Sequence, residues 1–353
     1  MKSLRVGVIG QGRSGRNIHT EFLKNVPGKF TIVCVADVLK DRGERAEKEY
    51  GCESYTDYRE MLKRDDLDLI VNATPSHLHP PVTKEILEAG FNVLCEKPLA
   101  RRAADVDELI EVAKKAGKLF AIYQQSRFAP YYQQVCKVIE SGVLGRIVMA
   151  KVAFNGFARR YDWQTLQGFN GGNLLNTGPH PMDQVLGIIG RDIMPKVWCQ
   201  MERVNTYGDA EDFCKIILSH EGRTTIDLEV VSNAAYPSAI YELYGTYGSL
   251  KGTMGRIDWK YYIPEEAPEI KLDSEPLPGP SYCSDKLVWH ERGWNVPSSQ
   301  KDLFNSMGAK FYSNLYNAIT KGEDLVIPPE QVRQQVAVIE ECHRQNPLSK
   351  MGE

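Results

Sequence analysis

The 353-residue sequence has no uninterrupted apolar stretch that approaches the roughly 20 residues of a membrane-spanning helix. Its first apolar residues, in MKSLRVGVIG, run directly into a glycine-rich turn, which is typical of a buried strand and not of a signal peptide. The eight cysteines are scattered without a CxxC pair, so we expect neither a metal site nor a disulfide framework. Reduced thiols and the lack of targeting or membrane segments predict a cytoplasmic protein.

The sequence also lacks a strong net charge. Its 43 basic residues nearly balance 46 acidic ones, which gives a net charge of −3. No global field would attract nucleic acid or an anionic membrane, so we expect neither as a partner. The length and a hydrophobic content of 42% predict a folded chain of two domains, with a cleft between them.

Residues 1–125 alternate between short apolar runs and segments of helical periodicity. The apolar runs cover residues 4–9, 31–36, 67–72, 91–95 and 119–123, and the helical segments include 41–50, 81–89 and 104–116. Uniformly apolar runs are typical of strands buried on both faces. The alternation predicts an α/β protein whose first domain is a doubly wound parallel sheet of the Rossmann type.

Residues 126–353 are expected to form a second α/β domain, for substrate binding and oligomerisation. After a helical segment at 131–141, alternating runs occur at 148–157, 196–204, 212–219, 224–231 and 240–244, interrupted by one predicted helix over 174–189. These runs predict a large, mostly antiparallel sheet with an open face. Residues 255–299, rich in proline and aromatics, are expected to form a long ordered excursion, and the final helices, within 311–344, are placed to pack back on the first domain.

A glycine-rich turn joins the first predicted strand to the next helix. It reads Gly10-Gln11-Gly12-Arg13-Ser14-Gly15. Between a strand and a helix, the first glycine permits a tight turn, the second lets the backbone approach a pyrophosphate and the third lets helix and strand pack closely. The helix N-terminus then presents free N–H groups to the phosphates, so the turn predicts dinucleotide binding.

Asp37 follows Gly15 by 22 residues, at the end of the second predicted strand. A carboxylate there accepts hydrogen bonds from both ribose hydroxyls and repels a 2′-phosphate, which favours NAD over NADP. Lys40 and Arg42 lie close by in the sequence and weaken this preference. Asp37 is also placed to act as a simple helix cap.

Two further motifs carry a family resemblance. Residues 73–79, ATPSHLH, lie after the third predicted strand and contain a TPxxxH pattern, and Glu96-Lys97-Pro98 lies after the fourth. With residues 245–250 and the closing helices, they make the chain similar, over almost its full length, to the Gfo/Idh/MocA family of glucose–fructose oxidoreductases and inositol dehydrogenases. The resemblance implies NAD(P)-dependent oxidation or reduction of CH–OH groups in sugars, inositols or related polyols. It places these residues beside the cofactor: Thr74, Pro75, His77, Glu96, Lys97 and Gln125.

Lys97 is implied to project into the cleft beside the reacting carbinol. Its ammonium group can bind the substrate oxygen and stabilise developing alkoxide charge. A lysine at the carboxyl end of a parallel strand also lies where open sheets bind their ligands.

Residues 171–183, GGNLLNTGPHPMD, resemble the family's GGGxLxDxGxHxxD helix. On one helix, Asn176, His180 and Asp183 would share the face that lines the cleft. His180 is the candidate base, because its pKa ordinarily lies near neutral, and Asp183 either orients it or is a buried structural partner. Asn176 stands where the family motif carries an aspartate and cannot accept a proton, which leaves proton transfer to His180 and Lys97.

Arg160 and Trp163 fall where the family's substrate loop lies. Tryptophan offers an apolar face to sugar C–H groups and arginine offers directional hydrogen bonds, although both could simply pack the loop. Arg127 and Asn176 complete the candidate substrate-binding set.

These features predict an NAD-dependent dehydrogenase that oxidises a secondary hydroxyl of a sugar, a glycoside or an inositol. We expect the aromatic excursion to widen or cover the sugar site, which would admit a glycoside oxidised at C3. Two alternatives stay open: an NAD-dependent glycosidase with a transient redox cycle, and a non-catalytic regulator that binds NAD and sugar. The open sheet face predicts a homo-oligomer, a dimer or a tetramer.

Overall fold

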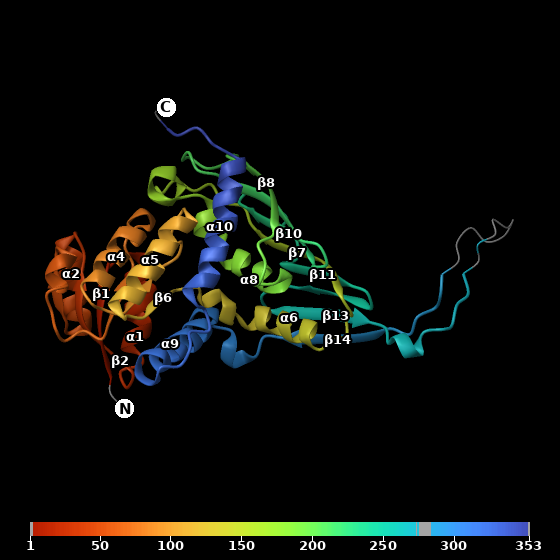
Figure 1. Ribbon diagram of the computed structural model, residues 1–353, viewed down its shortest axis with the longest axis horizontal. Coiled ribbons are helices and arrows are strands. Elements are labelled where there is room, and N and C mark those ends of the chain that lie inside the picture. Colours follow the sequence, from red (N-terminus) through yellow and green to blue (C-terminus); the bar gives the residue numbers. More distant parts are fainter. Residues whose placement is uncertain (1–2, 273, 275–283, 352–353) are drawn as a thin grey trace.

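The computed structural model describes residues 3–272, 274 and 284–351, and it contains two sheets. Figure 1 shows the smaller sheet and its helices at one end of the molecule and the larger sheet at the other. Within the described ranges, no helix has both the length and the apolar character needed to cross a membrane.

The first sheet confirms the predicted doubly wound arrangement. Its strands pair in parallel in the order β3-β2-β1-β4-β5-β6. Their bounds are β1 (Leu4–Ile9), β2 (Phe30–Ala36), β3 (Glu53–Tyr55), β4 (Leu69–Asn72), β5 (Val93–Cys95) and β6 (Phe120–Ile122). The edge strand β3 was not predicted, because its three residues are polar or half-buried and form no apolar run.

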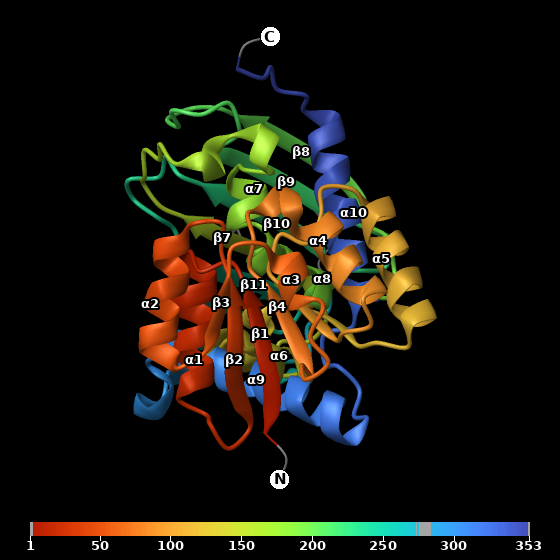
Figure 2. The same ribbon diagram turned by 90° about the vertical axis from the view of Figure 1, so that its left-hand side faces the viewer.

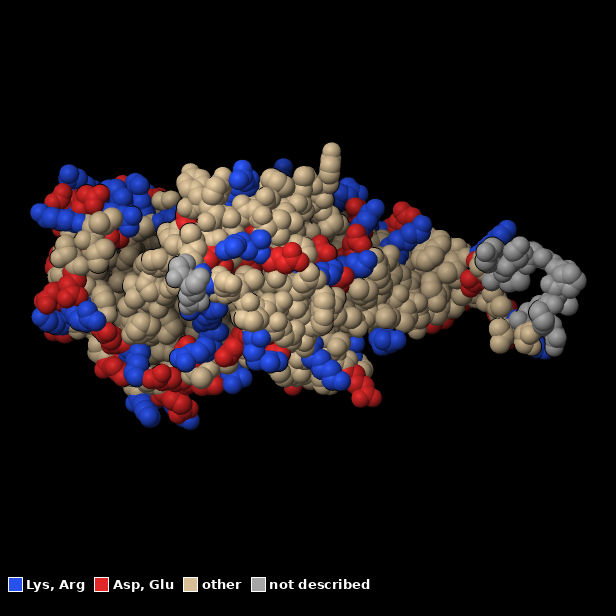
Figure 3. All heavy atoms as spheres, turned by 90° about the horizontal axis from the view of Figure 1, so that it is seen from above, with Lys and Arg blue, Asp and Glu red and all other residues tan. Residues whose placement is uncertain are grey.

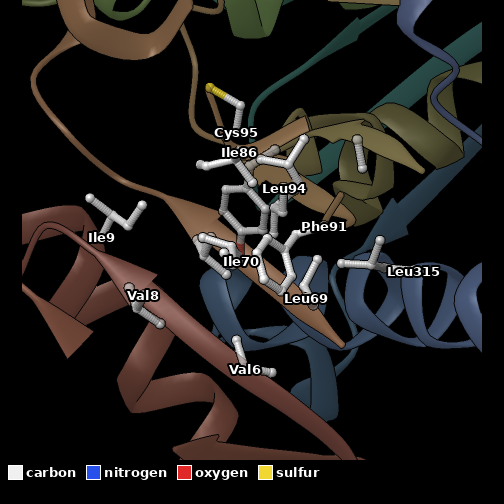
Figure 4. Close-up of a cluster of buried hydrophobic side chains, with 14 of the residues drawn as sticks. Val6, Val8, Ile9, Leu69, Ile70, Ile86, Phe91, Leu94, Cys95 and Leu315 are labelled. Atoms are coloured by element: carbon white, nitrogen blue, oxygen red, sulfur yellow. The ribbon is translucent and has the colours of Figure 1, made fainter. Parts of the chain in front are cut away.

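Helices cover both faces of this sheet (Figure 2). A π-helical turn, Gly15–Thr20, leads into α1 (Glu21–Lys24) and follows the glycine-rich turn directly. The other helices are α2 (Lys40–Tyr50), α3 (Tyr58–Met61), α4 (His79–Glu88) and α5 (Ala103–Ala116). Side chains of β1, β4 and β5 form the core beneath them (Figure 4).

The second sheet has eight strands in the order β14-β13-β12-β11-β7-β10-β9-β8, of which β7 and β10 pair in parallel and the others antiparallel. Their bounds are β7 (Ile147–Asn155), β8 (Lys196–Glu202), β9 (Phe213–Ser219), β10 (Thr225–Val231), β11 (Tyr241–Gly245), β12 (Gly248–Gly252), β13 (Arg256–Tyr261) and β14 (His290–Asn295). Helices α6 (Pro130–Glu140), α7 (Asn173–Asn176) and α8 (Pro179–Ile189) cover one face (Figure 1). The predicted mostly antiparallel sheet is confirmed.

The closing helices α9 (Leu303–Lys321) and α10 (Pro329–Gln345) join the two parts of the molecule. Leu315 of α9 is buried in the first core (Figure 4). Val332 of α10 is also in the first core, whereas Ile339, two turns later, is in the second. The helices therefore pack back on the first sheet, as their placement in the sequence suggested.

The aromatic excursion does not cover the cleft. It contributes β13 and β14 to the sheet edge, and the chain between them leaves the body on the side away from the first sheet (Figure 1). The described residues of this segment therefore do not cover the sugar site, and the alternative that the segment widens the site stays a prediction. Its Tyr282 and Cys283 lie outside the described residues, and the described cysteines are all free thiols.

Candidate active site

The segment that was predicted as one helix over 174–189 forms two. Helix α7 ends at Asn176 and α8 begins at Pro179, with Thr177 and Gly178 between them. Proline has no N–H with which to continue the hydrogen bonding of the preceding helix, so the helix restarts there. Asn176 consequently does not share a helix face with His180 and Asp183.

A cavity of about 440 Å³ lies at the carboxyl ends of β1, β2, β4 and β5. Seen from above Figure 1, the surface is hollowed at the end of the molecule that holds the first sheet (Figure 3). Nine of the predicted cofactor residues line this cavity: Gly10, Gly12, Arg13, Ser14, Asp37, Thr74, Pro75, Glu96 and Lys97. Its size and position suit a dinucleotide bound across the ends of a parallel sheet.

The glycine-rich turn is closed too tightly for side chains. Gly10 has a φ of +90°, and a Cβ there would lie 2.4 Å from the carbonyl oxygen of Ala73. A Cβ on Gly15 would lie 1.8 Å from the carbonyl oxygen of Gly10, so Gly15 lets helix and strand meet. Both glycines thus have the packing roles that the motif predicts, and they leave the turn open towards the cavity.

The carboxylate of Asp37 is held by the backbone at the cavity wall. It accepts hydrogen bonds from the N–H groups of Gln11, at 2.7 Å, and Leu39, at 2.9 Å. The Arg42 guanidinium lies 3.3 Å away and also lines the cavity. Gln11, expected to bind the cofactor, instead supports Asp37 from outside the cavity.

Two histidines follow β4, and the one predicted to contact the cofactor, His77, is the less connected. His79 links two loops, because its Nδ1 lies 2.7 Å from the Pro98 carbonyl oxygen and its Nε2 lies 2.9 Å from that of Thr74. His77 does not line the cavity, and its ring packs edge-to-face on Phe169. The sequence signal for His79 was the TPxxxH pattern, of which it is the histidine.

Lys97 is anchored by its neighbour Glu96, which is 3% exposed. One Glu96 oxygen lies 3.1 Å from Nε2 of His19, and the other accepts the Lys97 backbone N–H at 2.9 Å. The second ring nitrogen of His19 lies 2.6 Å from the Tyr312 hydroxyl, in α9. Burial raises the pKa of Glu96, but the hydrogen bond and charge of His19 outweigh it and hold that pKa at about 2. The sequence analysis missed His19 and Tyr312.

The Lys97 ammonium bridges the two domains. Its Nζ donates a 2.9 Å hydrogen bond to the backbone carbonyl of Asn176, at the end of α7. Burial lowers the pKa of Lys97, and the charges of Arg13 and Arg160 lower it further against the opposing charge of Glu96. The cavity therefore ends at an enclosed cation.

His180 stands in the first turn of α8. Its Nδ1 is buried and has no hydrogen-bond partner in the described part of the chain. Burial, with the nearby charge of Lys97, lowers the pKa of His180 to about 3. The ring is thus a neutral imidazole near neutral pH, able to accept a proton.

Asp183 and Arg127 bind each other instead of the cleft. Asp183 is fully buried, and its carboxylate accepts hydrogen bonds from Arg127, at 2.9 Å, and from Arg191, at 3.1 Å. Arg127 also donates to the Val326 carbonyl, before α10. Asp183 thus makes no hydrogen bond to His180. The geometry supports the alternative of a buried structural partner, and it gives no support to substrate binding by Arg127.

The remaining predicted site residues differ in whether they reach the dinucleotide cavity. Trp163 lines the dinucleotide cavity, where it is 40% exposed and packs against Phe169. Arg160 donates to the side chains of Asp162 and Gln164, which line the same cavity. Gln125 is buried with an unpartnered Oε1 and, like Gly15, does not line the cavity.

Comparison with known proteins identifies the class. Residues 4–124 match the model of an oxidoreductase family with an NAD-binding Rossmann fold, and residues 132–251 match the GFO/IDH/MocA C-terminal domain. The chain therefore belongs to the Gfo/Idh/MocA family of NAD-binding oxidoreductases.

Relatives of this chain include proteins that match most of its length. An uncharacterized oxidoreductase of Schizosaccharomyces pombe is 24% identical over 99% of this chain and 98% of its own. The 2,7-anhydro-N-acetylneuraminate hydratase of Mediterraneibacter gnavus is 25% identical over 71% and 67%. The fold is also that of the WlbA dehydrogenase from Bordetella pertussis, solved with NADH and UDP-GlcNAcA: TM-score 0.78, 22% identity, covering 98% of this chain and 95% of that one.

Proposed function

We propose that the protein oxidises a secondary hydroxyl of a sugar, a glycoside or a polyol with NAD. The observation that carries this proposal is the enclosed Lys97 ammonium at the end of the dinucleotide cavity, whose charge also lowers the pKa of the His180 imidazole. A hydrogen-bond donor and a nearby proton acceptor are the two groups that hydroxyl oxidation requires. We also propose that the first domain ends near residue 125.

In this reaction the carbinol loses a hydride from carbon and a proton from oxygen, and the C–O bond becomes a carbonyl. NAD, when bound, accepts the hydride. Lys97 holds the hydroxyl oxygen and stabilises the charge that develops on it. His180 takes the hydroxyl proton. Arg160 and the Asn176 amide, whose side chain makes no hydrogen bond within the described residues, orient the rest of the substrate.

A redox-neutral reaction is the second candidate. Its support is the similarity of this chain to a protein named 2,7-anhydro-N-acetylneuraminate hydratase, because that name implies no net oxidation. A transient oxidation followed by re-reduction, as in the NAD-dependent glycosidase alternative, would use the same two residues. Such an enzyme would convert its substrate without releasing NADH.

The test is a substrate panel of free sugars, inositols and aryl glycosides with NAD and NADP, followed by NADH absorbance and product analysis. Lys97→Ala and His180→Ala should each lower turnover by roughly two to four orders of magnitude. Binding of NADH, measured by fluorescence, should stay near wild type. The matched controls, Lys115→Ala and His220→Ala, change exposed residues outside the site and should retain activity. Near-normal turnover in both site variants would refute the assignment.

A further inference from the structure

A loop of the second domain completes the wall of the dinucleotide cavity. Within the described ranges, the residues that line this cavity lie between 9 and 97, with three exceptions. The exceptions are Asp162, Trp163 and Gln164. The ring of Trp163 packs against Phe169, which in turn packs against His77 of the first domain. A dinucleotide in the cavity would therefore contact residues 162–169, here named the cavity loop, as well as the first domain.

Asp209 and Gln167 hold the cavity loop by contacts that lie outside the cavity, because neither residue lines it. One carboxylate oxygen of Asp209 accepts the backbone N–H of Gln167 at 2.7 Å. The side-chain amide of Gln167 donates to the backbone carbonyl of Asp209 at 2.9 Å. Asp209 is 5% exposed and Gln167 is 9% exposed, so water cannot easily replace these hydrogen bonds if they are lost.

The carboxyl-terminal segment, residues 347–351, binds the same two side chains. The second carboxylate oxygen of Asp209 accepts the backbone N–H of Met351 at 2.9 Å. The side-chain amide of Gln167 also donates to the carbonyl of Ser349 at 3.2 Å. Each of these two side chains thus joins the cavity loop to the carboxyl-terminal segment.

The carboxyl-terminal segment is fixed to the second sheet where it begins. Asn346, at the end of α10, accepts the backbone N–H of Met201 at 3.0 Å and donates to the carbonyl of Cys199 at 3.0 Å. Both partners belong to the edge strand β8, beside which α10 ends (Figure 1). The segment therefore links the edge of the second sheet to the wall of the dinucleotide cavity.

We propose that the carboxyl-terminal segment holds the cavity loop in place for the cofactor, with Asp209 and Gln167 as positioning residues for dinucleotide binding. A loop that already has its binding arrangement loses little conformational freedom when the ligand arrives, which favours affinity. If only a fraction of the molecules has the loop in place, the apparent Kd rises by the inverse of that fraction. The inference requires NAD binding but not the proposed hydroxyl oxidation.

NADH binding in the absence of a substrate tests the inference, because this measurement does not depend on turnover. Asp209→Ala removes both carboxylate acceptors, and Gln167→Ala removes the side-chain donor. We expect each variant to raise the Kd of NADH about tenfold, mostly through faster dissociation, measured by stopped-flow fluorescence. Asp209→Asn keeps one acceptor oxygen, so its Kd should lie between those of the wild type and Asp209→Ala.

Asp107→Ala is the matched control for the loss of two hydrogen bonds to an acid. Asp107 of α5 accepts two hydrogen bonds from Arg333 of α10, both at 3.0 Å, and it does not line the cavity. This variant should dissociate NADH at the wild-type rate. An effect as large as that of Asp209→Ala would indicate a general structural cause and would overturn the inference.

Deletion of residues 347–353 tests the carboxyl-terminal segment itself. The deletion should raise the Kd of NADH to a similar extent and should speed hydrogen exchange of the backbone amides in the cavity loop. Added to Gln167→Ala, it should have little further effect, because both changes break the same link. Wild-type dissociation and loop exchange after the deletion, or full additivity of the two changes, would show that the inference is wrong.

Asp209→Asn replaces the deletion if the shortened chain does not fold. Faster NADH dissociation from this folded variant supports the inference, and the wild-type rate refutes it. A negative result leaves the dehydrogenase proposal intact. Conversely, the expected changes in NADH binding without oxidation of any polyol in the substrate panel would refute only the dehydrogenase proposal.

Discussion

At the scale of single residues, the placement of Lys97 depends on a buried chain of hydrogen bonds. It runs from the Tyr312 hydroxyl through His19 to Glu96 and then to the Lys97 backbone. Tyr312 is 1% exposed and His19 is fully buried, so water cannot replace a lost link easily. A helix near the carboxyl end of the chain thereby helps to fix a lysine of the first domain.

The charge at the end of this chain should be visible in the pH profile of turnover. Glu96 raises the pKa of Lys97, so Glu96→Gln should lower it. Because the proposed mechanism needs Lys97 as an ammonium, the alkaline limb of the kcat profile should then move to lower pH. An unchanged limb, with folding intact, would show that Lys97 does not control it.

Removing the Tyr312 hydroxyl, the first link of this chain, should affect turnover less than removing the Glu96 charge. Tyr312→Phe loses one buried hydrogen bond, worth about 1 kcal/mol of stability. We expect kcat to fall roughly tenfold, equivalent to about 1.4 kcal/mol, with little change in KM, because the substrate contacts remain. Tyr132→Phe is the control: it loses a 3.1 Å hydrogen bond to the Gln184 carbonyl, remote from Lys97. Equal kcat losses in both variants would indicate a general structural effect.

At the scale of elements, periodicity predicted most of the strands that carry apolar runs. Leu4–Ile9 is identical in prediction and structure, and the glycine-rich turn after it was placed correctly. The polar edge strands β3 and β14 were missed, since their stability comes mainly from pairing with a neighbour. The short strands β12 and β13 next to β14 were missed as well.

The site was predictable where a motif fixes it locally and not where long-range contacts do. The turn, Asp37 and Lys97 lie at the ends of predicted strands, so they could be placed from the sequence. His19, Tyr312 and the Arg127–Asp183 pair depend on contacts between residues 56 or more positions apart. The sequence shows Pro179, which breaks a helix. The prediction followed instead the spacing of Asn176, His180 and Asp183, which would place all three on one face of a continuous helix.

A buried acid that the proposed mechanism does not use, Glu211, lies before β9 and contacts the short helix α7. Glu211 accepts the N–H of Leu174 at 2.9 Å, and His343 of α10 lies 3.9 Å from its other oxygen. Burial raises the pKa of Glu211 to about 7, with Asp212 acting in the same direction and Arg101 against it. The helix that positions the Asn176 carbonyl is therefore held by a carboxyl group that is partly protonated near neutral pH.

This shift predicts a loss of stability with rising pH. The native state retains the Glu211 proton that the unfolded chain releases near its ordinary pKa of 4.5, so the free energy of unfolding falls between about pH 4.5 and about pH 7 and then levels off. Glu211→Gln should abolish this contribution and raise stability above neutral pH by about 2 to 3 kcal/mol, measured by urea unfolding. Glu221→Gln, at an exposed site, should leave the slope unchanged.

His343 separates this prediction from other titrations. Burial lowers the pKa of His343 to about 4, below its ordinary 6.5. Because the unfolded chain therefore takes up this proton before the native state does, His343 lowers the free energy of unfolding as pH falls. Glu211→Gln should keep this acid-side loss. If the variant also shows the wild-type decline towards neutral pH, Glu211 is not its source.

At the scale of the whole molecule, the outer face of the second sheet satisfies much of its own charge. Lys215 of β9 pairs with Asp227 and, at 2.8 Å, with Glu229, both on β10. Lys260 of β13 pairs with Glu291 of β14 at 2.9 Å. The same sheet also exposes Trp198 of β8 and Tyr244 of β11, so this surface is mixed and not a continuous apolar one. The homo-oligomer proposed from the sequence would therefore gain from a further source of apolar contact.

The arm between β13 and β14 is the better candidate for that contact. Its described residues are 262–272, 274 and 284–289, and Figure 1 shows the arm standing away from the body. Several of its apolar side chains are exposed: Ile270, Leu272, Val288 and Trp289. Exposed apolar groups on a projecting segment favour burial against a second copy of the chain.

Substituting glutamate for Leu272 and Val288 together should therefore shift the protein to a smaller assembly, measured by light scattering during size-exclusion chromatography. The two side chains are 85% and 57% exposed within one chain, so the fold itself should change in stability by less than about 0.5 kcal/mol. Glutamate at Met194 and Met351, which are 50% and 64% exposed away from the arm, is the matched control. A monomeric wild type would refute the homo-oligomer. An unchanged assembly in the Leu272 and Val288 variant would instead place the subunit contact on the sheet face. Burying Lys215 and its partners there costs free energy, which contacts from the opposing copy would have to offset.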